Sequence, residues 1–417
     1  MAMFNALTWT FLGALVAVTA TRLWLSQRQI RHVRAHRGAV PPTFADAIPL
    51  SAHQKAADYT VAKARLGMIE LMIGTAALLL LTLGGLIDWL QAEWARLAEP
   101  GALWHGVALI SSAAVLLAAV DLPLSLYRTF VIEQRYGFNR MSVRLFLVDL
   151  AKQALLAAAL GIPLLLLVLW LMQKMGALWW FYVWLAWMGF NLLVLLLFPT
   201  FIAPLFNRFT KLEDASLAGR IESLLKRCGF RASGLYVMDG SKRSSHGNAY
   251  FTGFGAAKRI VFFDTLLSRL APPEVEAVLA HELGHYRLHH VWKRIALLFA
   301  VSLGFLWLLG QIIDEPWFYQ GLGVSQPSTA AALLLFMLTV PVFTFFLHPV
   351  SSLYSRRHEF EADAYAARHA DSSQLVRALV KLYQDNAATL TPDPVHSAFY
   401  DSHPPAAVRI ARLKTAQ

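Results

Sequence analysis

The sequence predicts an all-α integral membrane protein. Of its 417 residues, 57% are hydrophobic and only 15% are charged, a composition too apolar for an ordinary soluble enzyme of this length. Several apolar runs are long enough to cross the roughly 30 Å hydrocarbon core of a bilayer. These seven runs lie at residues 4–25, 67–90, 103–127, 145–173, 178–200, 292–313 and 329–350.

The seven runs divide the chain into four predicted parts. The first five spans form a membrane domain at residues 1–206, and a polar unit follows at 207–291. Spans six and seven occupy 292–350, and a polar tail occupies 351–417. The first span should be retained, because basic residues follow it instead of preceding it, the reverse of a secretory signal. The single cysteine, Cys228, excludes an intramolecular disulfide.

The charge pattern predicts the orientation and the partners. The formal net charge is +11, but the basic residues cluster beside apolar runs, where they contact anionic lipid and set topology. We therefore expect membrane lipid as a partner, and no nucleic acid. Arginines and lysines follow the first and third spans. In contrast, the links at 91–102 and 314–328 together contain a single basic residue, Arg96. The polar unit and the tail should accordingly face the cytoplasm.

Several polar side chains lie inside or at the ends of the spans, among them Asp121, Asp149, Lys152, Gln153 and Asn191. The sequence assigns no role to Asp149, Lys152 or Asn191. Ionisable groups at membrane depth usually face a bundle interior or an aqueous cavity, which predicts an enclosed water-filled space. The alternative is that Asp149 and Lys152 pair with each other at i, i+3 near an interface. Both interpretations remain open at this point.

A metal-binding pattern lies on a helix predicted to begin at Pro272. His281 and His285 are four residues apart, which places both imidazoles on one helical face with Glu282 beside them. This pattern is typical of a zinc site in which Glu282 is the general base for hydrolysis. The third ligand must come from elsewhere, because the extended single-helix pattern would need a histidine at Val291. His289 and His290 are expected to be interfacial cations only.

The missing ligand is predicted on a second helix, after the seventh span. Glu359 and Asp363 share a face at i, i+4. Glu359 can complete a site for one Zn²⁺ per chain, and Asp363 can accept a hydrogen bond from the far nitrogen of a ligand histidine. The alternative is a solvated acidic face balanced by Arg356 and Arg357.

These residues belong to a set of motifs that resembles a known family. The chain resembles the membrane metalloproteases of the CAAX prenyl protease type, also called Ste24-like, over nearly its whole length. The motifs that carry the resemblance are residues 136–139, 244–253, 258–267, 281–285, 356–363 and 402–405 together with Arg409. Two positions depart from the family, because His358 and Glu361 stand where Phe and Gln are common. We expect neither to touch the metal site.

The resemblance implies a fold, an activity and further site residues. It implies seven membrane helices enclosing a chamber, with zinc inside and a cytoplasmic zincin-like catalytic unit that contains a short β-sheet. The substrate would be a peptide or protein, with Asn248 and Ala249 nearest to it on a strand edge. His403 would stabilise the oxyanion, with Arg409 as a substrate-binding companion. The alternative for residues 248–252 is an interior strand.

The biological role remains open between several alternatives. The substrate could be prenylated, or the enzyme could clear misfolded or translocon-jammed proteins with the same metal site. A seven-span transporter or receptor with a non-catalytic metal site is the alternative of another class. The composition favours a bacterial inner membrane, with the endoplasmic reticulum membrane as the alternative in a eukaryote. A monomer is expected.

Overall fold

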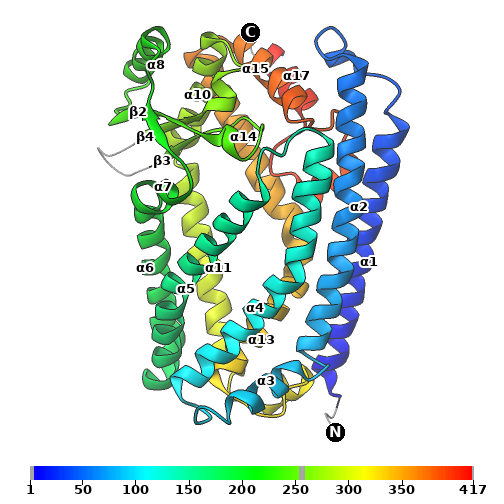
Figure 1. Ribbon diagram of the computed structural model, residues 1–417, viewed down its shortest axis with the longest axis vertical. Helices are drawn as coiled ribbons and strands as arrows, with labels where there is room; N and C mark the ends of the chain where they lie inside the picture. Colours follow the sequence, from blue (N-terminus) through cyan, green and yellow to red (C-terminus); the bar gives the residue numbers. More distant parts are fainter. Residues whose placement is uncertain (1–3, 253–258, 416–417) are drawn as a thin grey trace.

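The structure is a computed structural model that describes residues 4–252 and 259–415. Gly253 and Lys258 of the sequence motifs lie outside these residues. Within them, seven helices are long and apolar enough to cross a membrane, which confirms the predicted number of spans. Figure 1 shows these helices along the long axis, with the sheet, the helices beside it and the C-terminus gathered at one end. The chamber implied by the resemblance stays a prediction.

The span-length helices are longer than the apolar runs of the sequence, and several continue past the ends of those runs. They are α1 (Ala6–Ala35), α2 (Leu50–Leu81), α4 (Leu103–Tyr127) continued by the π-helical η2 (Arg128–Glu133), α5 (Val143–Lys174), α6 (Trp179–Leu197) continued by η4 (Phe198–Ile202) and α7 (Ala203–Phe206), α11 (His290–Ile312), and α13 (Thr329–Thr344) continued through η7 (Phe345–Leu347) into α14 (His348–His369). Short elements connect them: η1 (Pro42–Phe44), α3 (Leu86–Trp94), η3 (Gly176–Leu178) and α12 (Pro316–Gly321).

The residues predicted as a polar unit and as a polar tail share one core and are together called the polar unit from here on; it combines helices with a small mixed sheet. Its elements are β1 (Phe209–Lys211), α8 (Ala215–Arg227), β2 (Gly234–Met238), η5 (Gly240–Lys242), β3 (Ala249–Thr252), β4 (Arg259–Phe263), α9 (Asp264–Leu267), α10 (Pro272–Arg287), α15 (Ser372–Asp385), α16 (Pro394–Tyr400) and α17 (Ala406–Thr415). Among the described strands the order is β1-β2-β4-β3. β4 pairs parallel with β2 and antiparallel with β3, which therefore lies at the edge of the described sheet.

The unit has its own apolar core, separate from that of the spans. The β-branched and aromatic residues Ile260 and Phe262 of β4 are fully buried in it, as strand propensities favour. α8 contributes Leu217, Ile221 and Leu224, whose spacing forms one apolar helical face. The helix α10 begins at Pro272, as the sequence predicts, and the Glu274 carboxylate accepts a hydrogen bond from the Ala271 amide at 2.7 Å.

An ion pair connects the membrane spans to the polar unit. Arg243, after η5, donates to both carboxylate oxygens of Asp149 on α5, from Nε at 2.8 Å and Nη2 at 3.0 Å. Lys152 instead donates to the Leu205 carbonyl at 2.7 Å, and Asn191 donates to Trp187 within its own helix. The alternative of an Asp149–Lys152 pair is therefore wrong, because each side chain finds a partner on a neighbouring segment.

The crossing of α10 and α14 positions the residues of the predicted metal site. Gly284 lies between His281 and His285, on the side of α10 that faces α14. A Cβ atom at this position would lie 3.0 Å from the Ala362 Cα and 3.1 Å from the Tyr365 Cβ. Because those atoms belong to the backbone or adjoin it, they cannot move independently of α14. The two helices can therefore approach this closely only with glycine at position 284.

This packing predicts opposite effects of the same substitution at two helical glycines. Gly284→Ala should lower the thermal unfolding temperature, because separation of α10 and α14 outweighs the gain of about 1 kcal/mol in helix propensity. Gly219→Ala on α8 is the matched control, since no atom lies within 4 Å of its added Cβ. It should raise the unfolding temperature. Equal stabilisation by both substitutions, measured on the purified full-length protein, would contradict the close crossing.

Candidate metal centre

The two histidines of the predicted motif lie on one face of α10. Their Nε2 atoms are 3.3 Å apart, and the two rings are nearly perpendicular. His281 is buried and His285 is partly buried. The i, i+4 spacing therefore brings the two imidazole nitrogens together as the sequence predicts.

Glu359 approaches both histidines from α14. Its Oε2 is 3.4 Å from His281 Nε2, and its Oε1 is 3.3 Å from His285 Nε2. A tetrahedral zinc ion with bonds of about 2.0–2.1 Å separates its ligand atoms by about 3.3 Å. Glu359 is only 2% exposed, and its Oε2 has no hydrogen-bond partner among the described residues. The donor set, its spacing and this buried oxygen all fit one zinc ion.

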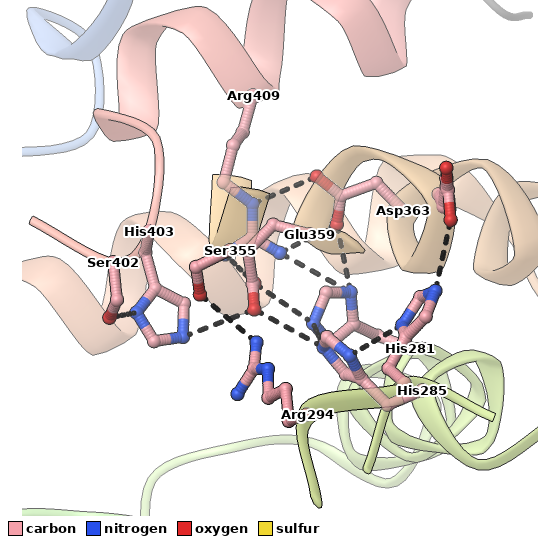
Figure 2. Close-up of polar contacts among 11 residues, drawn as sticks. His281, His285, Arg294, Ser355, Glu359, Asp363, Ser402, His403 and Arg409 are labelled. Carbon is pink, nitrogen blue, oxygen red and sulfur yellow. Dashed lines mark hydrogen bonds and ion pairs between the residues drawn. The ribbon is translucent and has the colours of Figure 1, made fainter. Parts of the chain in front are cut away.

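Asp363 supports His281 at its Nδ1 atom, and Arg409 holds Asp363. The Nδ1 of His281 lies 2.9 Å from Asp363 Oδ1. Arg409, on α17, donates to Asp363 from Nε at 2.8 Å and from Nη2 at 2.6 Å (Figure 2). In this position the Asp363 carboxylate can fix the ring orientation and leave Nε2 available for a cation. Arg409 is buried against Asp363, so its main contact is this carboxylate.

Glu282 is partly buried on α10, next to His281 in sequence. Burial raises the pKa of Glu282 above its ordinary value, and the neighbouring His281 and His285 partly oppose that shift. A carboxylate with a raised pKa accepts a proton more readily than an exposed one, which suits a general base.

His403 reaches the centre from the loop before α17. Its Nε2 is 3.4 Å from Glu359 Oε1, while its side chain is 62% exposed. Ser402 Oγ lies 3.0 Å from the Nδ1 of the same ring, on the opposite side from Glu359 (Figure 2). When the Ser402 hydroxyl donates to Nδ1, the proton of the neutral ring is on Nε2 and points toward the centre. The exposed ring can therefore offer an N–H to a bound ligand.

Asn248 and Ala249 lie at the start of the edge strand β3 rather than among the metal-binding side chains. Asn248 is exposed, and its side chain accepts a hydrogen bond from the Ala249 amide at 2.8 Å. Neither residue hydrogen-bonds to the histidines or to Glu359 in the part of the chain that the structure describes. β3 does contact α10, so the edge lies beside the helix that carries the motif.

The expectation that His290 is an interfacial cation is wrong. His290 is 1% exposed, and its Nδ1 lies 3.0 Å from the Nδ1 of His285. Its Nε2 lies 3.0 Å from Glu361 Oε2, so Glu361 also reaches the centre indirectly. Local sequence gives no signal for this arrangement, because it depends on the break between α10 and α11. His289, at that break, has a left-handed backbone with φ of 57°.

Comparisons with known proteins cover the whole architecture. Residues 29–208 match the protein family described as "CAAX prenyl protease N-terminal, five membrane helices". Residues 211–417 match the family described as "Peptidase family M48". The CAAX prenyl protease 1 of Saccharomyces cerevisiae is 33% identical over 426 residues, which cover 96% of this chain and 94% of the relative. The CAAX prenyl protease 1 homolog of Homo sapiens is 31% identical, with 94% and 93% covered.

A solved structure extends this similarity to three dimensions. The crystal structure of S. mikatae Ste24p has a TM-score of 0.90 and 31% sequence identity, and the match covers 98% of this chain and 99% of that one. The matches confirm the predicted metalloendopeptidase embedded in a membrane and give no support to a transporter or receptor. The chain therefore belongs to the CAAX prenyl protease 1 (Ste24) family of M48 membrane metallopeptidases.

Proposed function

We propose that the protein hydrolyses peptide bonds with one zinc ion per chain, held by His281, His285 and Glu359. The observation that carries this proposal is the spacing of 3.3–3.4 Å between the two imidazole nitrogens and the carboxylate oxygens. Family M48 peptidases generally depend on zinc, which supports the choice of metal. When bound there, zinc supplies a Lewis acid and lowers the pKa of water.

The side chains around the ligands have separate tasks in this proposal. Glu282 takes the proton of the attacking water and delivers it to the departing amine, which requires a carboxylate beside the ligands. His403 donates its Nε2 proton to the oxygen that becomes negative during attack. Its exposed ring near Glu359 supports this role. Asp363, held by Arg409, keeps His281 in the tautomer that a cation needs.

The substrate is proposed to bind as an extended peptide along β3. This strand pairs with β4 on one side only among the described strands, so its other side can pair with a peptide. Asn248 immediately precedes this strand and Ala249 begins it, and these two residues would lie nearest the peptide. The names of the relatives suggest a protein with a prenylated CAAX terminus as substrate. A role in clearing misfolded or translocon-jammed proteins remains the alternative.

The catalytic unit is proposed to face the cytoplasm. The basic residues that follow the first and third spans support this orientation through the positive-inside rule. A bacterial inner membrane remains the predicted location, and the endoplasmic reticulum membrane remains the alternative. We keep the expectation of a monomer as part of the same proposal.

Metal analysis of the purified protein tests the ligand set. The unchanged protein should contain about one zinc ion per chain, whereas His285→Ala should lose most of it, because two remaining protein ligands hold zinc weakly. His53→Ala is a control, since His53 is buried on α2 and bonds only to the His36 carbonyl among the described residues. Full zinc occupancy in a folded His285→Ala protein would contradict the site.

Glu282→Gln separates metal binding from catalysis. The amide has nearly the same shape but cannot take a proton from water, so peptide hydrolysis should fall roughly 10²- to 10⁴-fold while the zinc content is kept. Glu222→Gln, at an exposed position on α8, should leave hydrolysis unchanged. Hydrolysis at the normal rate in Glu282→Gln would exclude Glu282 as the general base.

Two substrates separate the proposed biological roles. One is a peptide ending in a farnesylated CAAX sequence, and the other is an unprenylated, loosely folded protein. A CAAX-processing enzyme should cleave the first with the higher kcat/KM, because the lipid contributes binding energy in the membrane body. Preference for the unprenylated protein would favour the quality-control alternative. Loss of both activities in Glu282→Gln would show that neither comes from a contaminant.

A further inference from the structure

We propose that His290 and Glu361 position the zinc ligand His285, by holding the proton on its Nδ1 atom. The proposal rests on the proposed zinc site and adds two positioning residues to it. For His285 to bind a cation through Nε2, its single ring proton must be on Nδ1. A buried N–H of this kind needs an acceptor, and the acceptor sets the orientation of the ring.

The acceptor of this proton is the Nδ1 of His290. The two Nδ1 atoms are 3.0 Å apart, so His285 donates and the lone pair of His290 accepts. The proton of His290 is then on Nε2, which lies 3.0 Å from Glu361 Oε2. Each hydrogen bond in this sequence requires the next one, because a neutral imidazole carries a single N–H. Glu361 therefore determines which nitrogen of His290 can accept.

At His281, the other proposed ligand histidine, a carboxylate accepts the Nδ1 proton directly, with no second imidazole between them. His281 donates directly to Asp363, which Arg409 holds with two hydrogen bonds. For His285, one additional imidazole stands between the ligand and the carboxylate. Glu361 accepts from Arg357 at 3.0 Å through its other oxygen. Both ligands are thus backed by a carboxylate and an arginine, although the carboxylate is buried only behind His281.

The cluster formed by His290, His358 and Glu361 is not a second metal site. His290, His358 and Glu361 do bring three potential ligand atoms within 4.8 Å of one another. However, the rings of His290 and His358 are stacked, with centroids 4.0 Å apart and planes 9° from parallel. An ion must lie close to the plane of each imidazole that binds it, and it cannot lie in two parallel planes at once. His358 instead covers the face of His290 and holds its ring in place.

Zinc affinity tests this role without any substrate. His290→Phe keeps the stacked ring but removes both nitrogens, so the zinc dissociation constant should rise about 10- to 100-fold. His290→Asn places a carbonyl oxygen close to the position of Nδ1, so it should restore part of the lost affinity. Glu361→Ala should weaken zinc binding less than His290→Phe. Without Glu361 the tautomer of His290 is no longer fixed, but its Nδ1 atom is still present and can accept the proton of His285. Competition with a chromophoric chelator measures each constant.

A double variant distinguishes positioning from general damage. If Glu361 acts through His290, adding Glu361→Ala to His290→Phe should cost almost no further affinity. Additive losses would overturn the proposal, as would an unchanged dissociation constant in both single variants. His53→Phe is the matched control, because His53 is equally buried but lies on α2 and bonds to a backbone carbonyl. It should leave zinc affinity unchanged.

Two further readouts keep the test decisive. The absorption spectrum of the cobalt-substituted protein should change in His290→Phe, since a freely turning His285 alters the ligand field. The 34% exposed side chain of Glu361 makes Glu361→Ala the variant least damaging to folding, so it tests the proposal alone if His290→Phe fails to fold. Absence of zinc binding in the unchanged protein would instead refute the proposed function.

Discussion

The burial of Glu359 is the constraint on which the arrangement of the centre depends. A carboxylate at 2% exposure has lost almost all its water, and an ion in this position is costly unless opposite charges or N–H groups surround it. His281, His285, His403 and Arg409 all direct nitrogen atoms toward it within 3.8 Å. The proposed cation between the carboxylate and the two histidines would complete this compensation and would give Oε2 the partner that it lacks among the described residues.

The close crossing of α10 and α14 makes that burial possible. Gly284 lets the Ala362 backbone approach the turn of α10 between the two histidines. Since Glu359 and Asp363 flank Ala362 on α14, they are placed against His281 and His285 by the same contact. α14 also continues from α13 through η7 as part of one candidate span. Glu359, the proposed third ligand, therefore lies on the continuation of a candidate membrane helix.

The sequence predicted the parts of this centre that depend on helical spacing. His281 with His285, and Glu359 with Asp363, are i, i+4 pairs, so a helix alone brings each pair onto one face. The seven spans followed from apolar length, and α10 followed from Pro272 at its start. These features need no knowledge of tertiary packing. The same spacing rule left an Asp149–Lys152 pair open as an alternative, but each of these side chains binds a partner on another segment.

What sequence could not predict depends on where helices end and how they pack. The pattern at Arg409 contains nothing that indicates Asp363 as its partner, because the two residues meet only when α17 packs against α14. Likewise the partner of Asp149, Arg243, follows a strand of the polar unit far along the chain. Burial of His290 was missed for the same reason, since a histidine after an apparent helix end looks like a surface cation.

The break between α10 and α11 explains how His290 returns to the centre. In one uninterrupted helix, a residue five positions after His285 would point about 140° away from it. The left-handed conformation of His289 ends α10, and α11 begins at His290 with a new direction. A non-glycine residue in this conformation costs roughly 1–2 kcal/mol, which the surrounding contacts must offset. Because α11 is also the sixth candidate span, this turn joins a membrane helix to the Nδ1 side of His285, the proposed zinc ligand.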